Sequence, residues 1–209
     1  MTLSGTISGT YEVIKMERLN IIVAGVGGQG LITLSNVLGK AAVNSGTKVL
    51  VAETHGLSQR GGSVEVHVRL GNVYAPLIPV GGADILVGME LIEAARFLYY
   101  LKSGGVTVLN DRVIKPAVPG VIEPARDDLV NYISSHASNV YLVNALELAE
   151  RAGSPLAQNM AVLGALVSTG ILEGFVSKEA IVRVIKTLRN PEVNVKAFEL
   201  GFSETRRLK

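Results

Sequence analysis

A glycine-rich hexapeptide, set between an apolar run and a helical pattern, is the feature of this sequence that most restricts its fold. Residues 19–25 form a short apolar run rich in β-branched side chains, and apolar residues recur at helical spacing over residues 31–43. Between them, Gly25-Val26-Gly27-Gly28-Gln29-Gly30 fits the pattern G-x-G-x-x-G. In this context the pattern is typical of the strand, turn and helix that open a nucleotide-binding α/β domain.

The chemistry of such a turn depends on the missing side chains of glycine. A tight turn and the close approach of a phosphate leave no space for a Cβ, while the helix N-terminus offers unpaired N–H groups. Glu53 follows Gly30 by 23 residues, near the spacing of about 20 at which an acid binds ribose hydroxyls. We therefore expect a cofactor to bind at the turn, through Gly25, Gly27, Gly28, Gln29 and Gly30. The alternative is that these glycines only let the first helix pack closely against the first strand.

Further apolar runs divide the rest of the chain into strands and helices. Residues 48–52 predict a second strand, apolar on both faces and joined to the first in a parallel βαβ unit. Residues 64–70 alternate apolar side chains with Glu65, His67 and Arg69, which predicts a strand with one face that is wet or lines a site. Other strands are expected at 83–88, 105–110 and 140–143, and helices at 90–101, 127–136, 145–152, 156–172 and 177–188, the last with Ser177 as its N-cap. The sum is an α/β fold: a doubly wound, mostly parallel, Rossmann-like sheet with a helical C-terminal portion over residues 145–190.

The length of the chain favours a single domain. It has 209 residues, and a domain typically takes about 100–200. Residues 1–15 are rich in Ser, Gly and Thr and are expected to form a disordered leader, with Met16 as an alternative start and residues 16–209 as the domain. The leader lacks the basic region and apolar run of a signal peptide. The apolar stretch 155–172 is interrupted by polar residues and is poor for a bilayer span of about 20 residues, so no membrane is expected.

The absence of cysteine excludes several kinds of chemistry. Thiolates hold iron–sulfur clusters, form disulfides and serve as nucleophiles, and this chain has none. Its three histidines lack the spacing of metal ligands, so no metal site is expected. A net charge of +2 without an extended basic cluster gives no indication of nucleic-acid binding. Nothing in the composition argues for secretion, and we expect a cytoplasmic protein.

Residues 53–62 form a second candidate site. They leave the carboxyl end of the predicted second strand, where ligands bind in open α/β sheets. Arg60 is suited to clamping a phosphate or carboxylate, and the two glycines after it let the backbone approach a ligand. His55 and Arg60 are the catalytic candidates, although a hydrogen-bonded structural histidine and an internal ion pair explain them equally well. The cofactor-binding candidates of this loop are Glu53, Thr54, Ser58, Gln59, Arg60, Gly61 and Gly62.

Taken together, these segments resemble the gamma-type family of 2-oxoacid:ferredoxin oxidoreductases, the pyruvate/ketoisovalerate type. The resemblance is carried by residues 25–30, 53–64, 67–69, 82–88 with Glu90, 163–166 and 194–201, and it covers residues 19–202. Within the family, the indolepyruvate branch is the most similar. The combined loop pattern is specific, whereas the glycine turn alone is not.

The resemblance implies a multi-subunit enzyme that oxidatively decarboxylates an aryl or other 2-oxo acid to its acyl-CoA and passes electrons to ferredoxin. Such enzymes use thiamine diphosphate, magnesium and iron–sulfur clusters. This chain has neither cysteine nor a Gly-Asp-Gly motif, so these cofactors are expected in a larger, Cys-rich catalytic subunit. The implied role here is to close over the partner's site and help hold the 2-oxo acid or coenzyme A. The isolated chain is expected to be inactive, with a homodimer as one option for it.

Three other functions stay open at this stage. A stand-alone NAD(P)-binding oxidoreductase is supported by the turn and by Glu53. An adenylating enzyme also uses a Gly-x-Gly-Gly-x-Gly turn, but it typically relies on further acids and on cysteine chemistry. A nucleotide-binding module without catalysis needs only the turn.

Overall fold

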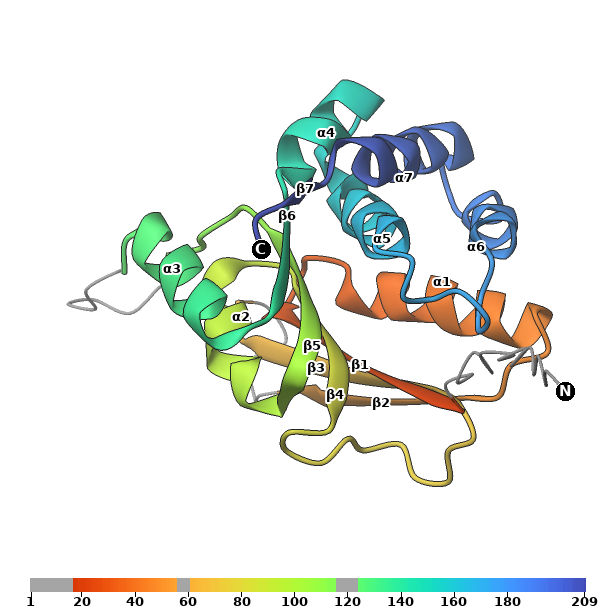
Figure 1. Cartoon of the computed structure of the whole chain (residues 1–209). Coiled ribbons are helices and arrows are strands. Elements are labelled where there is room, and N and C mark those ends of the chain that lie inside the picture. Colours follow the sequence, from red (N-terminus) through yellow and green to blue (C-terminus); the bar gives the residue numbers. More distant parts are fainter. Residues whose placement is uncertain (1–16, 56–60, 116–123) are drawn as a thin grey trace, which may run out of the picture.

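The computed structural model describes residues 17–55, 61–115 and 124–209, which form one sheet between two helical layers (Figure 1). The expected leader, residues 1–15, lies outside the described residues. The strands are β1 (Arg18–Val26), β2 (Val49–His55), β3 (Ser63–Gly71), β4 (Ala83–Gly88), β5 (Leu101–Asn110), β6 (Asn139–Val143) and β7 (Arg206–Arg207). The α-helices are α1 (Leu31–Asn44), α2 (Leu91–Phe97), α3 (Arg126–His136), α4 (Ala145–Ala152), α5 (Gln158–Ser168), α6 (Lys178–Ile185) and α7 (Pro191–Glu204), with short 3-10 helices η1 (Leu98–Tyr100) and η2 (Pro155–Ala157).

The seven strands are ordered β2-β3-β1-β4-β5-β6-β7. Neighbours from β1 through β4 and β5 to β6 are parallel, and β3 and β7 run against them. Helices cover both faces of this sheet, so the predicted doubly wound, mostly parallel fold is confirmed.

The predicted βαβ unit is wrong in one respect, because β3 lies between β1 and β2. β2 runs in the same direction as β1 but pairs only with β3, at the edge of the sheet. The connection between β2 and β3 is too short for a parallel crossover, which needs about a dozen residues or more, so β3 returns antiparallel. Val66 and Val68 of β3 are fully buried, whereas Val51 of β2 is 38% exposed, so the expectation that β2 is apolar and buried on both faces was also wrong.

The polar face of β3 is covered rather than wet. His67 is 1% exposed, its Nδ1 accepts a hydrogen bond of 3.0 Å from the Ile78 amide, and its ring meets Tyr100 edge-on. Burial and the nearby Glu65 carboxylate raise the pKa of Tyr100 to about 12, so its phenol stays neutral. This face of β3 therefore anchors the loop between β3 and β4 at the amino-terminal edge of the parallel strands.

Two hydrophobic cores hold the helices to the sheet. The larger core joins the inner face of β1 and β3 to α1 and to the C-terminal helices, and the smaller one joins the opposite face to α2 and α3. Figure 1 shows the same division, with α1 and α4 to α7 on one side of the sheet and α2 and α3 on the other. Ser177 caps α6 as expected, since its side chain accepts a hydrogen bond from the Ala180 amide.

The helical C-terminal portion extends beyond the expected residue 190. α7 begins with Pro191 and packs across α5 at two glycines, Gly164 and Gly201. A Cβ on Gly201 would overlap the carbonyl of Ala161, and one on Gly164 would overlap the carbonyl of Phe198. The two helix backbones are therefore in direct contact. None of the helices in the described ranges is both long and apolar enough to cross a membrane.

Candidate functional site

The glycine turn lies at the carboxyl edge of the parallel strands, between β1 and α1. The chain leaves β1 through α1 on one face of the sheet, and it leaves the adjacent strand β4 through α2 on the other face. A crevice forms where neighbouring parallel strands send their helices to opposite faces, and ligands of open α/β sheets bind there. The turn predicted from the sequence is thus placed where this fold binds ligands.

No side chain in the described ranges caps the start of α1, a feature that α1 shares with α3, α5 and α7. Gly30 is the N-cap residue at φ +81°, no side chain accepts from the first turn, and that turn carries no acidic residue. The amides of Leu31, Ile32 and Thr33 have no acceptor within the described ranges. Such a helix start carries partial positive charge and donors aimed outward, which suits an anion.

Two of the motif glycines are required by packing. A Cβ on Gly30 would lie 2.5 Å from Nδ2 of Asn159 in α5, whose side chain donates to the Gly30 carbonyl. A Cβ on Gly25 would lie 2.7 Å from the Cβ of Met89. Gly28, at φ +103°, faces open space. Close packing thus accounts for Gly25 and Gly30, but against Met89 and α5 more than between α1 and β1, and Gly28 is the position at which the turn faces open space.

Hollows flank the exposed helix start on two sides. One, of about 390 Å³, is bordered by residues 28–30 and Thr33 together with residues 154, 156–160, 188–190, 193 and 194. The other, of about 290 Å³, is bordered by residues 27–28, 30–33 and Val64. The first is in the lower part of the volume range of ligand pockets, about 300–1,000 Å³, and the second is just below that range. Thr33 borders both hollows, and its side chain is exposed.

Gln29 holds the turn against the neighbouring strand. Its side chain is 6% exposed, its Oε1 accepts from the Val26 amide at 2.8 Å, and its Nε2 donates to the Met89 carbonyl at 2.8 Å. Nδ2 of Asn110 donates to the same carbonyl. Gln29, expected to bind a cofactor, is thus engaged in fixing the shape of the turn.

Two carboxylates beside the turn were not singled out as site residues from the sequence. Glu90 is 1% exposed and accepts from the amides of Ile92 and Glu93, which makes it the N-cap of α2. Glu93 is 5% exposed and accepts from the hydroxyl of Ser63, the first residue of β3. The sequence signal for them is a Glu-x-x-Glu pair directly after a buried strand.

Burial raises the pKa of Glu90, and the adjacent Glu93 carboxylate adds to this, against the opposing effect of the amide hydrogen bonds. A carboxyl whose pKa is higher in the folded state stabilises the fold below its unfolded pKa and loses that contribution as pH rises through the folded value. We therefore expect the unfolding free energy of the wild type to fall, relative to that of Glu90→Gln, as the pH rises above about 4.5. Urea denaturation of both proteins between pH 4 and pH 8 measures this difference, and parallel profiles would contradict it.

Among the described residues of the second candidate loop, Gly61 and Gly62 contact the glycine turn, and Glu53 and Thr54 lie further away. The Gly27 amide donates to the Gly62 carbonyl at 2.9 Å, and the Gly61 amide donates to the Gly27 carbonyl at 3.4 Å. Glu53 and Thr54 lie on β2, two strand spacings or about 10 Å from β1. Ser58, Gln59 and Arg60 lie outside the described residues, and for His55 only the backbone, in β2, is described.

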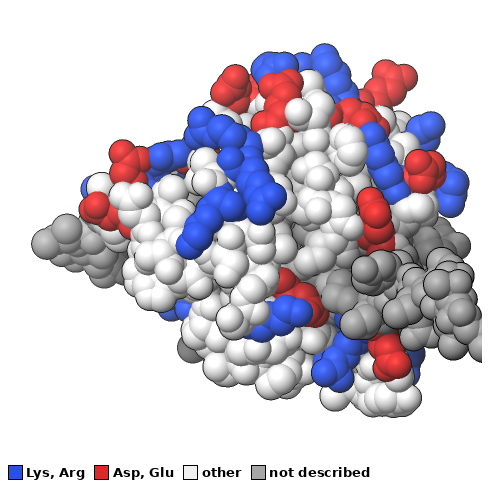
Figure 2. Space-filling model, viewed as in Figure 1, with Lys and Arg blue, Asp and Glu red and all other residues white. Residues whose placement is uncertain are grey.

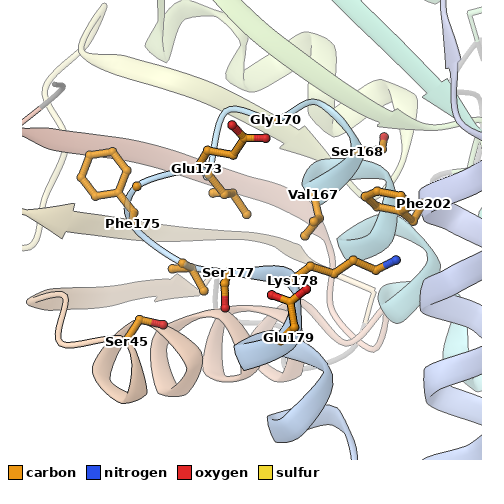
Figure 3. Close-up of a pocket in the computed structure, with 13 residues that line it drawn as sticks. Ser45, Val167, Ser168, Gly170, Glu173, Phe175, Ser177, Lys178, Glu179 and Phe202 are labelled. Atoms are coloured by element: carbon orange, nitrogen blue, oxygen red, sulfur yellow. The ribbon is translucent and has the colours of Figure 1, made fainter. Parts of the chain in front are cut away.

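A larger cavity lies elsewhere, at the C-terminal end of α1. It has a volume of about 590 Å³ and none of the predicted site residues borders it. In Figure 3, Lys178 extends toward Phe202, with its Nζ 3.9 Å from the ring centroid, and the same amine donates to Glu199. Its charged group is thus already partnered within the chain.

Figure 2 shows one contiguous group of basic side chains to the upper left of the centre of the view. Elsewhere on this face, basic and acidic side chains are scattered among broad uncharged areas. No group of three His, Asp or Glu side chains within the described ranges is arranged to hold a metal ion.

Comparison with known proteins gives consistent matches over almost the whole chain. A family profile described as pyruvate ferredoxin/flavodoxin oxidoreductase matches residues 20–204. The indolepyruvate oxidoreductase subunit IorB of Archaeoglobus fulgidus is 42% identical over 191 residues, which is 90% of this chain and 95% of the relative. IorB of Thermococcus kodakarensis is 40% identical over 195 residues, 89% of this chain and 95% of the relative. The 2-oxoglutarate synthase subunit KorC of Methanothermobacter marburgensis is 29% identical, covering 88% and 95%.

Solved structures share the fold. The pyruvate oxidoreductase subunit PORC of Thermotoga maritima superimposes with a TM-score of 0.70 at 21% identity, covering 92% of this chain and 99% of that one. The 2-oxoglutarate:ferredoxin oxidoreductase of Magnetococcus marinus, solved with 2-oxoglutarate, coenzyme A and succinyl-CoA bound, gives 0.66 at 22% identity. This match covers 90% of the present chain but only 31% of the other, so there the fold is one part of a longer polypeptide.

Proposed function

This chain belongs to the pyruvate ferredoxin/flavodoxin oxidoreductase family, and from that premise we propose that it is the subunit of an indolepyruvate-type 2-oxoacid:ferredoxin oxidoreductase that carries neither clusters nor thiamine. The whole enzyme converts an aryl 2-oxo acid and coenzyme A to the acyl-CoA and carbon dioxide and passes two electrons to ferredoxin. The observation that carries this proposal is the 42% identity to an IorB subunit over nearly the full length of both chains.

The cofactors of the reaction belong to a partner in this proposal. Thiamine diphosphate supplies the activation of the 2-oxo acid for loss of carbon dioxide, and clusters accept the electrons. The chain has no cysteine, and the described residues offer no metal-binding group. We therefore assign thiamine diphosphate, magnesium and the clusters to a larger, Cys-rich subunit.

We assign to this chain the binding of the anionic part of coenzyme A at the glycine turn. The uncapped N-terminus of α1 supplies amide donors, Gly28 leaves the backbone accessible, and hollows extend on both sides. The distant Magnetococcus enzyme, 31% of which matches this chain, was solved with coenzyme A bound, so coenzyme A is a ligand of an enzyme that contains this fold. Arg60, between the turn-contacting Gly61 and β2, is the candidate for a second anion contact, to a phosphate or to the carboxylate of the 2-oxo acid.

The face around the turn also suits contact with the partner. Ile32 is 41% exposed and Leu156 is 86% exposed, and each borders one of the two hollows. Exposed apolar side chains beside a ligand site are typical of a surface that another protein covers. In this arrangement the ligand is held between the two subunits.

The NAD-dependent alternative has lost its main support. In the dinucleotide fold the acid that binds ribose follows the strand beside β1, but here β3 occupies that place and Glu53 is one strand further away.

Reconstitution with the large subunit tests the proposal. This chain should be inactive alone, and anaerobic co-expression with the Cys-rich chain should give a stable complex that contains iron, sulfide and thiamine diphosphate. That complex should reduce viologen when given indolepyruvate and coenzyme A, and pyruvate or 2-oxoglutarate should support a lower kcat/KM. Full activity of the large subunit alone, or NADH binding by this chain without any complex, would contradict the proposal.

A further inference from the structure

We propose that Glu93 is a positioning residue for the site at the glycine turn, because it ties the end of β3 to α2 and so closes a ring of hydrogen bonds around the turn. The inference rests on the proposed function for its ligand, coenzyme A. The positioning itself is argued from hydrogen bonds among the described residues.

Glu93 makes two side-chain contacts from a nearly buried position. One carboxylate oxygen accepts from the Ser63 hydroxyl, and the other accepts from Nη1 of Arg96 at 2.8 Å. The Arg96 side chain is 63% exposed, whereas that of Glu93 is 7% exposed. An exposed arginine adds little to such a pair, so the contact with Ser63 is the one that defines the geometry.

Ser63 links Glu93 to the glycine turn. It is the first residue of β3 and pairs with Val26, the last residue of β1. Just before it, Gly62 and Gly61 exchange hydrogen bonds with the amide and carbonyl of Gly27. Glu93 therefore fixes the start of β3, next to the two glycines that are hydrogen-bonded to Gly27.

The other side of the turn leads back to the same helix. Gln29 donates to the Met89 carbonyl, the Met89 amide donates to Ala24 in β1 at 2.7 Å, and Glu90 caps α2. One turn later, α2 presents Glu93 to Ser63. The ring of hydrogen bonds thus runs from Gly27 through β3, Glu93 and α2 to Gln29. The amides at the start of α1, which we assign to the anion, follow Gln29 and Gly30 in the chain.

Stability alone is a poor explanation for this carboxylate. A buried acid loses solvation, and an apolar residue of similar size is often as stabilising or more so. Here two acids lie three residues apart, Glu90 as the N-cap of α2 and Glu93 in its first turn. Glu93 is a hydrogen-bond acceptor for Ser63 and so holds the turn in the shape that its ligand requires. This role explains why an acid is present at this position.

The test compares variants of the chain in the wild-type complex. Glu93→Ala and Ser63→Ala should each raise the KM for coenzyme A and its calorimetric Kd by about tenfold, with kcat changed less than twofold, since a loosened site weakens binding first. The double variant should be no worse than either single one, because both remove the same link. Glu93→Gln retains an acceptor for Ser63 and should restore wild-type binding, and Arg96→Ala is the matched control that should leave it unchanged.

Hydrogen exchange of the isolated chain gives a second readout that needs no partner. Amides of residues 25–30 should exchange faster in Glu93→Ala and Ser63→Ala than in Arg96→Ala, with melting temperatures recorded alongside. If Glu93→Ala does not fold, the smaller change in Ser63→Ala carries the same test. Unchanged exchange at the turn, or faster exchange with unchanged coenzyme A binding in an active complex, would overturn the inference. A wild-type complex without activity would instead overturn the proposed function and leave the exchange result to decide the positioning claim.

Discussion

Gly201→Ala should destabilise the protein by about 3 kcal/mol or more, because a methyl group at the crossing of α5 and α7 has no space. The added Cβ would overlap the backbone carbonyl of Ala161, which cannot move as a flexible side chain does. The helices must separate instead, and separation opens the packing around Ala197 and Phe198, both fully buried. For a chain of this size the melting temperature should fall by about 6–12 °C.

Gly39→Ala in α1 is the matched control. Gly39 is also a helical glycine, but a Cβ there would lie 3.8 Å from Val51, an ordinary contact. Alanine is the better helix former, so this change should stabilise the protein by about 0.5–1 kcal/mol. Thermal and urea unfolding of both variants measure the contrast, and equal stabilities would show that α5 and α7 do not pack as closely as described.

Thr33→Glu should weaken coenzyme A binding to the complex by about tenfold or more while leaving the fold slightly more stable. Thr33 is exposed in the first turn of α1, where a carboxylate interacts favourably with the helix dipole, by about 0.3–1 kcal/mol. The same negative charge borders both hollows and repels an anionic ligand, and a loss of about 1.4 kcal/mol is tenfold in Kd. Affinity and stability therefore change in opposite directions.

Thr33→Gln separates charge from size in this experiment. It places a side chain of the same length at the same position and should leave the Kd for coenzyme A within about threefold of wild type. Titration calorimetry of the complex and urea unfolding of the chain give the two quantities. Equal weakening by both variants would point to simple obstruction, and unchanged binding by Thr33→Glu would place the anion elsewhere.

The order of the elements could be predicted because their patterns are local. The apolar runs at residues 83–88 and 140–143 and the helical spacing at residues 145–152 each identify an element by themselves, and the structure has all three. α7 was missed as a helix because Asn194 and Gly201 interrupt its apolar pattern, although Pro191 is a favourable first residue. Its role depends on contact with α5, about 30 residues away along the chain, which no local pattern records.

The partner of β1 could not be predicted in the same way. The alternating pattern of residues 64–70 identifies a strand, but whether β2 or β3 pairs with β1 is decided by which strand buries more apolar surface against α1. The same limit applies to the site. The glycine turn is visible as a motif, whereas Glu90 and Glu93 gain their positions only when β4 and α2 are placed beside β1.

The insertion of β3 beside β1 also sets the order in which the molecule can be built. Only residues 56–62 separate β2 from β3, whereas residues 27–62 separate β1 from β3. Closing the β2–β3 hairpin therefore has the lower entropic cost. During synthesis the glycine motif emerges early, but the ring that shapes it is incomplete until Glu93 has left the ribosome. A fragment that ends before α2 contains the whole motif and cannot form the site.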